Sequence, residues 1–347
     1  MMIPSNPRIA IAGAGSVGCY IGGRLKAAGR NVVFLSRPAL KDAIKARGLA
    51  LADLNGGEKD LVLPPENLDV TDDPVTALST ADVILVTVKS GATAAIAEAI
   101  AAHAKPETVV VSLQNGVDNV DVLRHRLGPE RTVVAGMVPF NIVQTRDPGA
   151  PVSFRRATSG KVMIAEGCPR LQALLDVPGA PAREQKDMLG LQWTKLLLNL
   201  NNALNALAGV PLAQEFSDRG WRRLLAAQIK EGLATLKAAG IRPARFEGIH
   251  PRIVAGVLPL PDGLFRLLAR GMLAIDPRAR SSMWDDLEAG KPTEVDFIQG
   301  KVMSLAEETG TATPVTANVF LHIKDAEAAG RGSPRLSPLQ ISESDRG

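Results

Sequence analysis

A glycine-rich hexapeptide near the N-terminus, Gly13-Ala14-Gly15-Ser16-Val17-Gly18, limits the folds open to this chain more than any other feature. It has the spacing G-x-G-x-x-G, follows an apolar run that predicts a strand, and opens a segment with helical periodicity. In that context Gly13 permits a tight turn, Gly15 lets the backbone approach a pyrophosphate, and Gly18 lets the helix pack closely on the strand. The hexapeptide therefore predicts dinucleotide binding at a helix N-terminus, and a glycine-rich turn without a ligand is the alternative.

The first half of the chain continues this strand-then-helix rhythm. Its apolar runs are rich in Val and Ile and show little polar alternation, which is typical of parallel strands buried on both faces. Two short apolar segments between Leu49 and Leu63 flank Gly56-Gly57 and predict an inserted hairpin. The other predicted strands are Arg8 to Ala12, Val32 to Ser36, Asp82 to Val88, Thr108 to Leu113, Thr132 to Val138, Val152 to Phe154 and Lys161 to Ala165, and the helices are Val17 to Ala28, Thr93 to Ala102 and Val120 to Leu127.

The second half loses this rhythm and becomes helical. A length of 347 residues favours two domains, and apolar residues at helical spacing replace the strands from about Met188 onward. We predict an α/β, Rossmann-type doubly wound sheet over residues 1–188 and an all-α domain over residues 189–329. Residues 330–347 are rich in Ser, Gly and Pro and predict a disordered tail. The predicted helices are Trp193 to Leu207, Trp221 to Ala239, Val295 to Glu308 and Val315 to Ala328, the last with Thr313 as N-cap and Gly330 just past its end.

Composition excludes several classes of partner. The net charge of +4 comes from 40 basic and 36 acidic residues without long basic runs, and aromatic residues make up only 3%, so nucleic-acid binding is not expected. The longest leucine-rich stretch carries four asparagines, which are costly in a membrane. Two cysteines form neither a disulfide framework nor a metal-ligand pattern, so we expect no metal and a reducing, cytoplasmic location. The arginines that gather between residues 219 and 280 indicate a mild preference for small anionic ligands, and a solvated helix surface explains them at least as well.

The end of the second strand decides which dinucleotide is expected. An acidic residue there would accept hydrogen bonds from a ribose 2′-hydroxyl, but this chain has Ser36-Arg37. A guanidinium offers several donors to a 2′-phosphate, so we infer NADP(H) as the cofactor, although Arg37 could also be an ordinary surface arginine. Lys89, at the end of another strand, would lie at the same edge of the sheet and add positive charge near the cofactor.

A narrow polar stripe marks the helix that opens the second domain. At 100° per residue, Lys195, Asn199 and Asn202 fall within about 60° of one another on an otherwise apolar helix. Asparagine is a poor helix former, so the stripe indicates a half-buried face turned toward a cleft, where a lysine with a lowered pKa would donate a proton. A lysine that reaches solvent from the helix surface is an equally good interpretation. Ser282 with Asp285, and Thr293-Glu294, are explained by helix capping alone.

The combination of these motifs resembles the ketopantoate reductase family (2-dehydropantoate 2-reductases). The resemblance extends over nearly the whole chain except the tail. It rests on the glycine hexapeptide, Leu85-Val86-Thr87-Val88-Lys89, Gln114-Asn115-Gly116-Val117, Trp193-Thr194-Lys195-Leu196 with Asn199, Ser281-Ser282-Met283-Trp284-Asp285-Asp286 with Gly290, and Thr293-Glu294-Val295-Asp296. The glycine motif alone is common to many dehydrogenases, whereas the lysine and serine blocks are more specific.

The resemblance implies roles for the site residues. Lys195 would be the general acid and contact the substrate, Asn199 and Ser282 would hold its carboxylate and hydroxyl groups, and Asn115 would contact both nicotinamide ribose and substrate. Glu294 would orient the cofactor ribose or the lysine. The implied reaction is hydride transfer from NADPH to the ketone carbon of a 2-oxo acid, which gives pantoate if the substrate is ketopantoate. A homodimer is the assembly that the resemblance suggests.

One departure from the family pattern concerns substrate choice. The family usually has a second asparagine eight residues after the lysine, where this chain has Ala203, and we predict that Asn202 takes its role. This change leaves open another 2-oxo acid as substrate. An opine-like or 3-hydroxyacid dehydrogenase is the enzymatic alternative, and a non-catalytic NADPH sensor is the alternative from another class.

Overall fold

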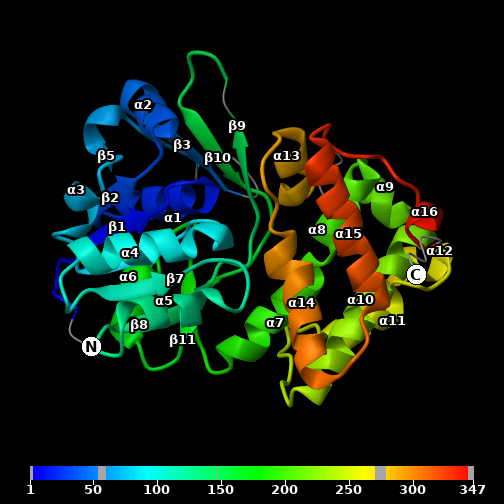
Figure 1. The fold of residues 1–347 in the computed structure, drawn as a ribbon. Helices are drawn as coiled ribbons and strands as arrows, with labels where there is room; N and C mark the ends of the chain where they lie inside the picture. Colours follow the sequence, from blue (N-terminus) through cyan, green and yellow to red (C-terminus); the bar gives the residue numbers. More distant parts are fainter. Residues whose placement is uncertain (1–2, 54–59, 146, 270–278, 343–347) are drawn as a thin grey trace. The chain divides into compact units, whose positions relative to one another are not determined.

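The chain divides into two compact units, residues 1–188 and residues 189–347. The structure is a computed structural model, in which residues 3–53, 60–145, 147–269 and 279–342 are described. The first unit is built around parallel strands and the second is made of helices (Figure 1). This confirms the predicted fold class.

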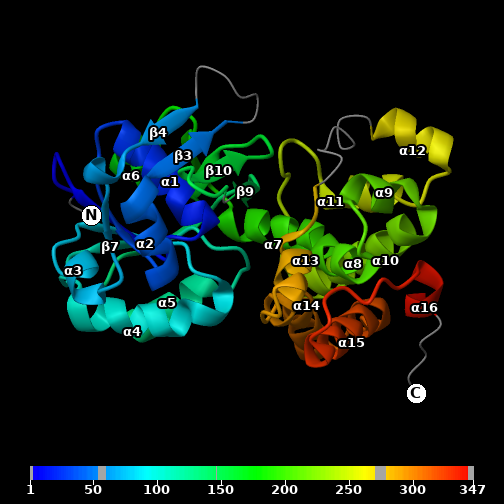
Figure 2. The ribbon, with the colours of Figure 1, turned by 90° about the horizontal axis from the view of Figure 1, so that it is seen from above.

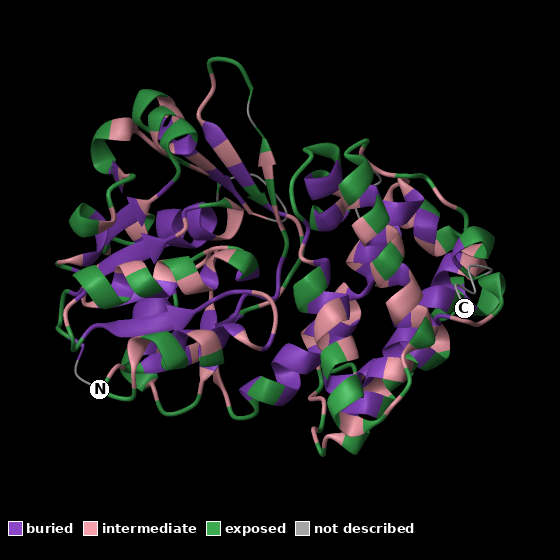
Figure 3. Cartoon of the chain, in the orientation of Figure 1, coloured by how far each residue is buried: buried purple, intermediate pink, exposed green. Residues whose placement is uncertain are grey.

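The first unit contains an eight-stranded sheet in the order β12-β11-β8-β7-β6-β1-β2-β5. Neighbouring strands are parallel except for β8 and β11, which are antiparallel. The central strands carry Val, Ile, Leu and Ala that are fully buried, as expected for strands covered on both faces (Figure 3). The strands are β1 (Arg8–Ala12), β2 (Asn31–Leu35), β5 (Asp69–Thr71), β6 (Val83–Val86), β7 (Val109–Ser112), β8 (Val133–Met137), β11 (Val162–Ala165) and β12 (Ala182–Gln185).

Helices cover both faces of this sheet (Figure 2). One apolar cluster joins the sheet to α1 (Ser16–Ala27) and α6 (Pro169–Leu175). A second cluster, on the other face, joins it to α3 (Pro74–Leu78), α4 (Thr93–His103) and α5 (Asn119–Leu127). Helix α2 (Pro38–Arg47) follows β2, and short 3-10 helices occupy Pro65–Asn67 (η1) and Ser90–Ala92 (η2).

A smaller sheet in the same unit contains the predicted hairpin. Its order is β4-β3-β10-β9, and β3 (Leu49–Ala52) pairs antiparallel with β4 (Leu61–Leu63), as the hairpin requires. Gly56 and Gly57 lie outside the described residues. Strand β10 (Val152–Arg156) pairs with β3 and with β9 (Ile142–Thr145), so residues distant in sequence complete this sheet.

The second unit is a set of packed helices. Where the sequence predicts one helix over Trp193 to Leu207, the structure has two, because α7 (Met188–Asn199) and α8 (Asn201–Ala208) are interrupted at Leu200. Asparagines on both sides weaken the helix there, and the Gln299 amide binds the Leu200 carbonyl at 3.0 Å. The remaining helices are α9 (Leu212–Ser217), α10 (Arg219–Ala238), α11 (Pro251–Val257), α12 (Asp262–Leu268), α13 (Ser282–Glu288), α14 (Val295–Thr309), α15 (Pro314–Ala329) and α16 (Pro338–Ser342).

The prediction of a disordered tail over 330–347 is wrong for the residues through 342. The backbone amide of Leu336 donates to the carbonyl of Leu207 at 2.9 Å, and the short helix α16 buries Ile341 to 1% exposure. Composition indicated disorder because so few residues there are apolar, but one buried side chain and long-range backbone bonds attach the segment to the helical unit. Residues 343–347 lie outside the described residues.

Candidate functional site

The four predicted cofactor segments leave neighbouring strands at the same edge of the main sheet. Strand β1 lies between β2 and β6, and β7 lies beyond β6. Ala12 pairs with Leu35 on one side and with Val86 on the other, and Val86 pairs with Ser112. Because the strands are parallel, their carboxyl ends meet at one edge, where α/β proteins bind ligands. The glycine hexapeptide, Ser36-Arg37, Lys89 and Asn115 are thereby gathered in one region.

The backbone conformation of the glycine turn explains why glycine occupies its positions. Gly13 has φ +99°, and a Cβ atom there would lie 2.3 Å from Cγ1 of Val88. A Cβ on Gly18 would lie 2.6 Å from the Thr87 hydroxyl oxygen, so side chains are excluded at both positions. Gly15 is exposed, and a Cβ on it would meet nothing closer than 4.0 Å. The space over Gly15 is therefore open to a ligand, while the Gly15 amide itself donates to the Gly13 carbonyl at 2.7 Å.

The N-terminus of α1 is suited to bind an anion. Gly15 occupies the N-cap position and offers no side-chain acceptor, and the first turn, which includes Ser16 and Val17, contains no acidic residue. The Ala14 amide is already bound to the Leu35 carbonyl at 2.8 Å. The first amides of a helix have no partner within the helix, so this uncapped end fits a pyrophosphate group.

The end of β2 carries the residues predicted to distinguish NADP from NAD. Arg37 is exposed and occupies the N-cap position of α2, with Pro38 as the first helical residue. The hydroxyl of Ser36 is buried, at 7% residue exposure, and has no hydrogen-bond partner among the described residues. A buried hydroxyl without a partner next to an exposed guanidinium fits a phosphate, which accepts from both. Lys89, after β6, is exposed.

Lys195 and Glu294 lie close enough in the helical unit to interact electrostatically. Lys195 is half-buried on α7, and Glu294 occupies the N-cap position of α14. Burial lowers the pKa of Lys195 to about 8, and the carboxylate of Glu294 opposes that shift because it stabilises the ammonium form. An amine with such a pKa is still mostly protonated at neutral pH and can give up its proton, as a general acid requires.

The remaining predicted substrate residues lie on α7, α8 and α13. Asn199 is half-buried at the end of α7, and Asn202 is half-buried at the start of α8, whereas Ala203 is fully buried. The hydroxyl of Ser281 donates to the Asn202 carbonyl at 2.9 Å, which holds the start of α13 against α8. Ser282, the first residue of α13, is exposed next to that contact.

The predicted capping role of Ser282 is wrong. The cap of α13 is Ser281, whose hydroxyl oxygen accepts from the Trp284 amide at 3.2 Å. The helix begins one residue earlier than the capping-box pattern predicts because Ser281 is anchored to α8 by the contact with Asn202 and by its own amide, which donates to Asn205 Oδ1 at 2.8 Å. At the other predicted box, Thr293 Oγ1 accepts from the Val295 amide at 3.2 Å, and the side chain of Glu294 makes no capping hydrogen bond.

A buried carboxylic acid next to this group of residues was missed from the sequence. Glu215 on α9 is 1% exposed, and Asn205 Nδ2 donates to its Oε2 at 2.6 Å. Burial raises the pKa of Glu215 to about 8, although hydrogen bonds from Asn205 and Asn201 oppose the shift. The short helix α9 gives no periodic signal, so only the accumulation of asparagines in α8 could have pointed to a buried polar partner.

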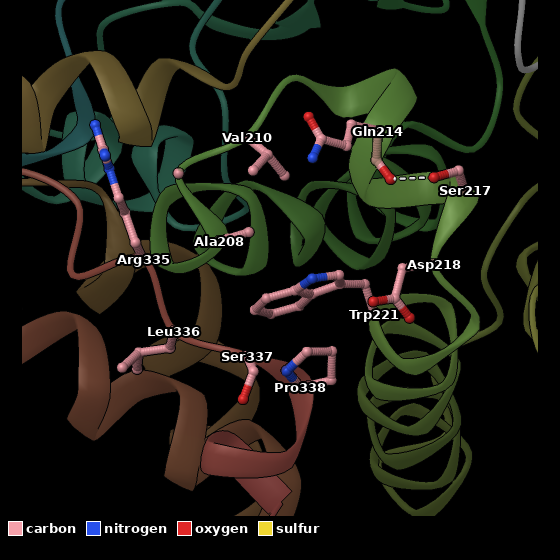
Figure 4. Close-up of a pocket in the computed structure, with 11 residues that line it drawn as sticks. Ala208, Val210, Gln214, Ser217, Asp218, Trp221, Arg335, Leu336, Ser337 and Pro338 are labelled. Atoms are coloured by element: carbon pink, nitrogen blue, oxygen red, sulfur yellow. Dashed lines mark hydrogen bonds between the residues drawn. The ribbon is translucent and has the colours of Figure 1, made fainter.

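The helical unit also contains a cavity of about 570 Å³ (Figure 4). Trp221, Asp218 and Gln214 line it together with Arg335, Ser337 and Pro338 from the segment after α15. It includes none of the predicted site residues. Among the described residues, no helix has the length and apolarity needed to cross a membrane, and no group of three His, Cys, Asp or Glu could hold a metal ion.

Comparison with known proteins assigns the chain to a family. Residues 9–167 match the family model described as "Ketopantoate reductase PanE/ApbA", and residues 187–327 match that of its C-terminal domain. The chain belongs to the ketopantoate reductase family. It is thus an oxidoreductase of a family that acts on CH–OH groups, as the resemblance implied.

Relatives in this family match along almost their whole length. The 2-dehydropantoate 2-reductase of Mesorhizobium japonicum is 27% identical and matches over 94% of this chain and 99% of its own. That of Halobacterium salinarum is 28% identical, over 93% of this chain and 100% of its own. The crystal structure of a PanE/ApbA family ketopantoate reductase from Ralstonia eutropha JMP134 has a TM-score of 0.77 at 28% identity, over 93% of this chain and 99% of that one. D-mandelate dehydrogenase in complex with NADH shares the fold, with a TM-score of 0.73 at 21% identity.

Proposed function

We propose that this ketopantoate reductase family member reduces 2-dehydropantoate to pantoate with NADPH. The observation that carries the proposal is the half-buried Lys195, with a pKa of about 8 and the carboxylate of Glu294 nearby, in a chain of this family. A cationic donor of this kind stabilises negative charge that develops on a ketone oxygen only during reduction.

Each unit contributes its own residues to the reaction. When bound, NADPH supplies a hydride to the ketone carbon. Lys195 Nζ delivers a proton to the ketone oxygen, and Glu294 keeps that amine charged until the transfer. Asn199 and Ser282 hold the carboxylate and hydroxyl groups of the substrate, and Asn115 contacts substrate and nicotinamide ribose. Asn202 replaces the asparagine that the family usually has at the position of Ala203.

The preference for NADPH rests on the end of β2. Arg37 and the buried hydroxyl of Ser36 would bind the 2′-phosphate, and Lys89 would add positive charge nearby. The glycine hexapeptide would bind the pyrophosphate. We expect Arg37→Asp to weaken NADPH binding at least tenfold more than NADH binding, measured by cofactor fluorescence. Lys45→Asp, at the exposed opposite end of α2, is the matched control and should affect the two cofactors alike. An equal loss of both cofactors in the Arg37 variant would contradict the phosphate assignment.

The function is tested by NADPH oxidation with a panel of 2-oxo acids. Ketopantoate should have the highest kcat/KM, and Lys195→Ala should lower kcat by at least a hundredfold while changing the Kd for NADPH less than threefold. Lys237→Ala, an exposed lysine on α10, is the control and should keep wild-type kinetics. Faster turnover of another 2-oxo acid would support the alternative substrate, and activity only on opine-like or 3-hydroxyacid substrates would support those dehydrogenases. Tight NADPH binding without any turnover would support a sensor.

Location and assembly remain predictions. We propose a cytoplasmic homodimer that takes part in pantothenate biosynthesis. A structural neighbour from Staphylococcus aureus, 18% identical, is described as a dimeric ketopantoate reductase, and at that identity it supports the fold rather than the assembly.

A further inference from the structure

A network of buried polar side chains contacts the turn of the first unit that contains Asn115, called here the Asn115 turn. Its members come from the start of η2, the start of α4, the last residue of β7, the turn after β7 and the start of α5. All of them are at most 6% exposed. Burying this many polar groups is costly unless each is paired, and a fully paired network fixes the segments that it joins. The members are Ser90, Thr93, Ser112, Gln114 and Asn119.

The hydrogen bonds of this network run in one direction. Gln114 Nε2 donates to Thr93 Oγ1 at 2.7 Å, and Thr93 Oγ1 donates to Asn119 Oδ1 at 2.7 Å. Asn119 Nδ2 donates to the backbone carbonyl of Asn115 at 2.5 Å and to Ser90 Oγ at 3.2 Å. A hydroxyl has one hydrogen to give, so the order Gln114, Thr93, Asn119 fixes the orientation of both amides.

The network ends on the Asn115 turn at one side. Ser90 Oγ donates to the same Asn115 carbonyl at 3.1 Å, so two buried donors converge on one peptide oxygen. Gly116 follows with φ +90°, which allows the chain to turn directly after this fixed peptide. Among the hydrogen bonds of the described residues, none involves the side chain of Asn115, which is half-buried. The direction of the Asn115 side chain is therefore set through the Asn115 backbone.

The other end of the network reaches the glycine turn. Gln114 Nε2 donates to the Val88 carbonyl at 3.1 Å, and Val88 packs against Gly13. The neighbouring Thr87 hydroxyl donates to the Gly13 carbonyl at 2.7 Å. A continuous set of contacts thus joins the carbonyl of Asn115 to the turn predicted to bind the pyrophosphate.

We propose that Asn119 is a positioning residue, which acts through the Asn115 carbonyl to hold the Asn115 side chain in register with the glycine turn. This inference rests on the proposed role of Asn115 in contacting nicotinamide ribose and substrate. A shift of about 1 Å in a group that orients reactants costs on the order of a hundredfold in rate, so such a buried support has a kinetic effect as well as a structural one.

The test uses variants that remove one polar group each. Asn119→Ala removes the amide that binds the Asn115 carbonyl, and Thr93→Val interrupts the network with little change in shape. Both should lower kcat/KM for the oxo acid at least tenfold, and Thr93→Ser, which restores the hydroxyl, should remain within threefold of wild type. Thr108→Val is the matched control, because Thr108 is also 1% exposed and donates to the Ala81 carbonyl at 2.8 Å, before the amino end of β7. It should lower the Tm without changing kcat/KM more than twofold.

A double-mutant cycle shows whether Asn119 acts through Asn115. In an Asn115→Ala background, Asn119→Ala should change kcat/KM less than twofold. A further tenfold loss in that background, or kcat/KM within twofold of wild type in both Asn119→Ala and Thr93→Val, would overturn the proposal. The Kd for NADPH is measured for the same four proteins. If the wild type reduces no oxo acid, the proposed function fails. The coupling between Asn115 and Asn119 is then calculated from the NADPH Kd values of the four proteins instead of from kcat/KM.

Discussion

The buried acid Glu215 makes the stability of the helical unit depend on pH. Burial raises its pKa from 4.5 to about 8, so between these values the folded chain holds a proton that the unfolded chain has released. The unfolded state then binds fewer protons, and the free energy of unfolding falls as the pH rises from 4.5 to about 8. The carboxyl favours the fold most below that window.

The size of the effect follows from the shift. One pKa unit corresponds to about 1.4 kcal/mol, so the loss due to Glu215 is about 2 kcal/mol at pH 6 and about 4 kcal/mol at pH 8. Glu215→Gln replaces the protonated acid with a neutral amide of the same shape, which still offers a carbonyl oxygen to Asn205 Nδ2. The variant should therefore gain roughly 2 kcal/mol relative to wild type between pH 6 and pH 8.

Urea unfolding followed by tryptophan fluorescence measures this directly. All three tryptophans, Trp193, Trp221 and Trp284, lie in the helical unit, so the signal reports the unit that contains Glu215. Glu307→Gln, an exposed position on α14, is the control and should show the same pH dependence as wild type. If wild type and Glu215→Gln differ by the same free energy at pH 6 and pH 8, Glu215 does not hold the proton, and the reasoning fails.

Two further predictions concern the lysine and the tail. With Lys195 as the proton donor, log kcat of the wild type should fall above pH 8. Glu294→Gln should move that fall to lower pH, because it removes the carboxylate that raises the pKa of the lysine. If the pH profile of kcat for Glu294→Gln is identical to that of the wild type, the pairing of Glu294 with Lys195 is refuted. Ile341→Ala should destabilise the helical unit by about 2 kcal/mol or more in urea unfolding, whereas Leu339→Ala, at 67% exposure, should change it little. Equal effects of these two substitutions would show that the tail does not depend on its buried residue.

The first unit was largely predictable because its signals are local. The glycine hexapeptide, the apolar strands and the helices between them are each encoded within about fifteen residues, and parallel pairing then brings their carboxyl ends together. The small sheet was only half predictable: the hairpin of β3 and β4 is local, but β10 joins it from about a hundred residues away.

The helix ends show where local rules fail. Thr313 occupies the N-cap position of α15 as predicted, yet its side chain makes no capping bond. The carboxylate of Glu231 accepts instead from the amides of Val315 and Thr316 at 2.8 and 2.9 Å, across 84 and 85 residues. A capping pattern states which residue is able to cap, while the tertiary structure decides which acceptor is nearest.

The sequence by itself determined the strand-and-helix character of the first unit, the helical character of the second, the family and the types of residue at the predicted site. Only the tertiary structure decided that Ser281 rather than Ser282 caps α13, that the tail is packed through Ile341, and that Glu215 is buried beside Asn205. The physical reason is the range of the forces involved. Backbone preferences and periodicity act within a few residues, whereas burial and the pKa shifts that follow from it depend on which distant segments exclude water.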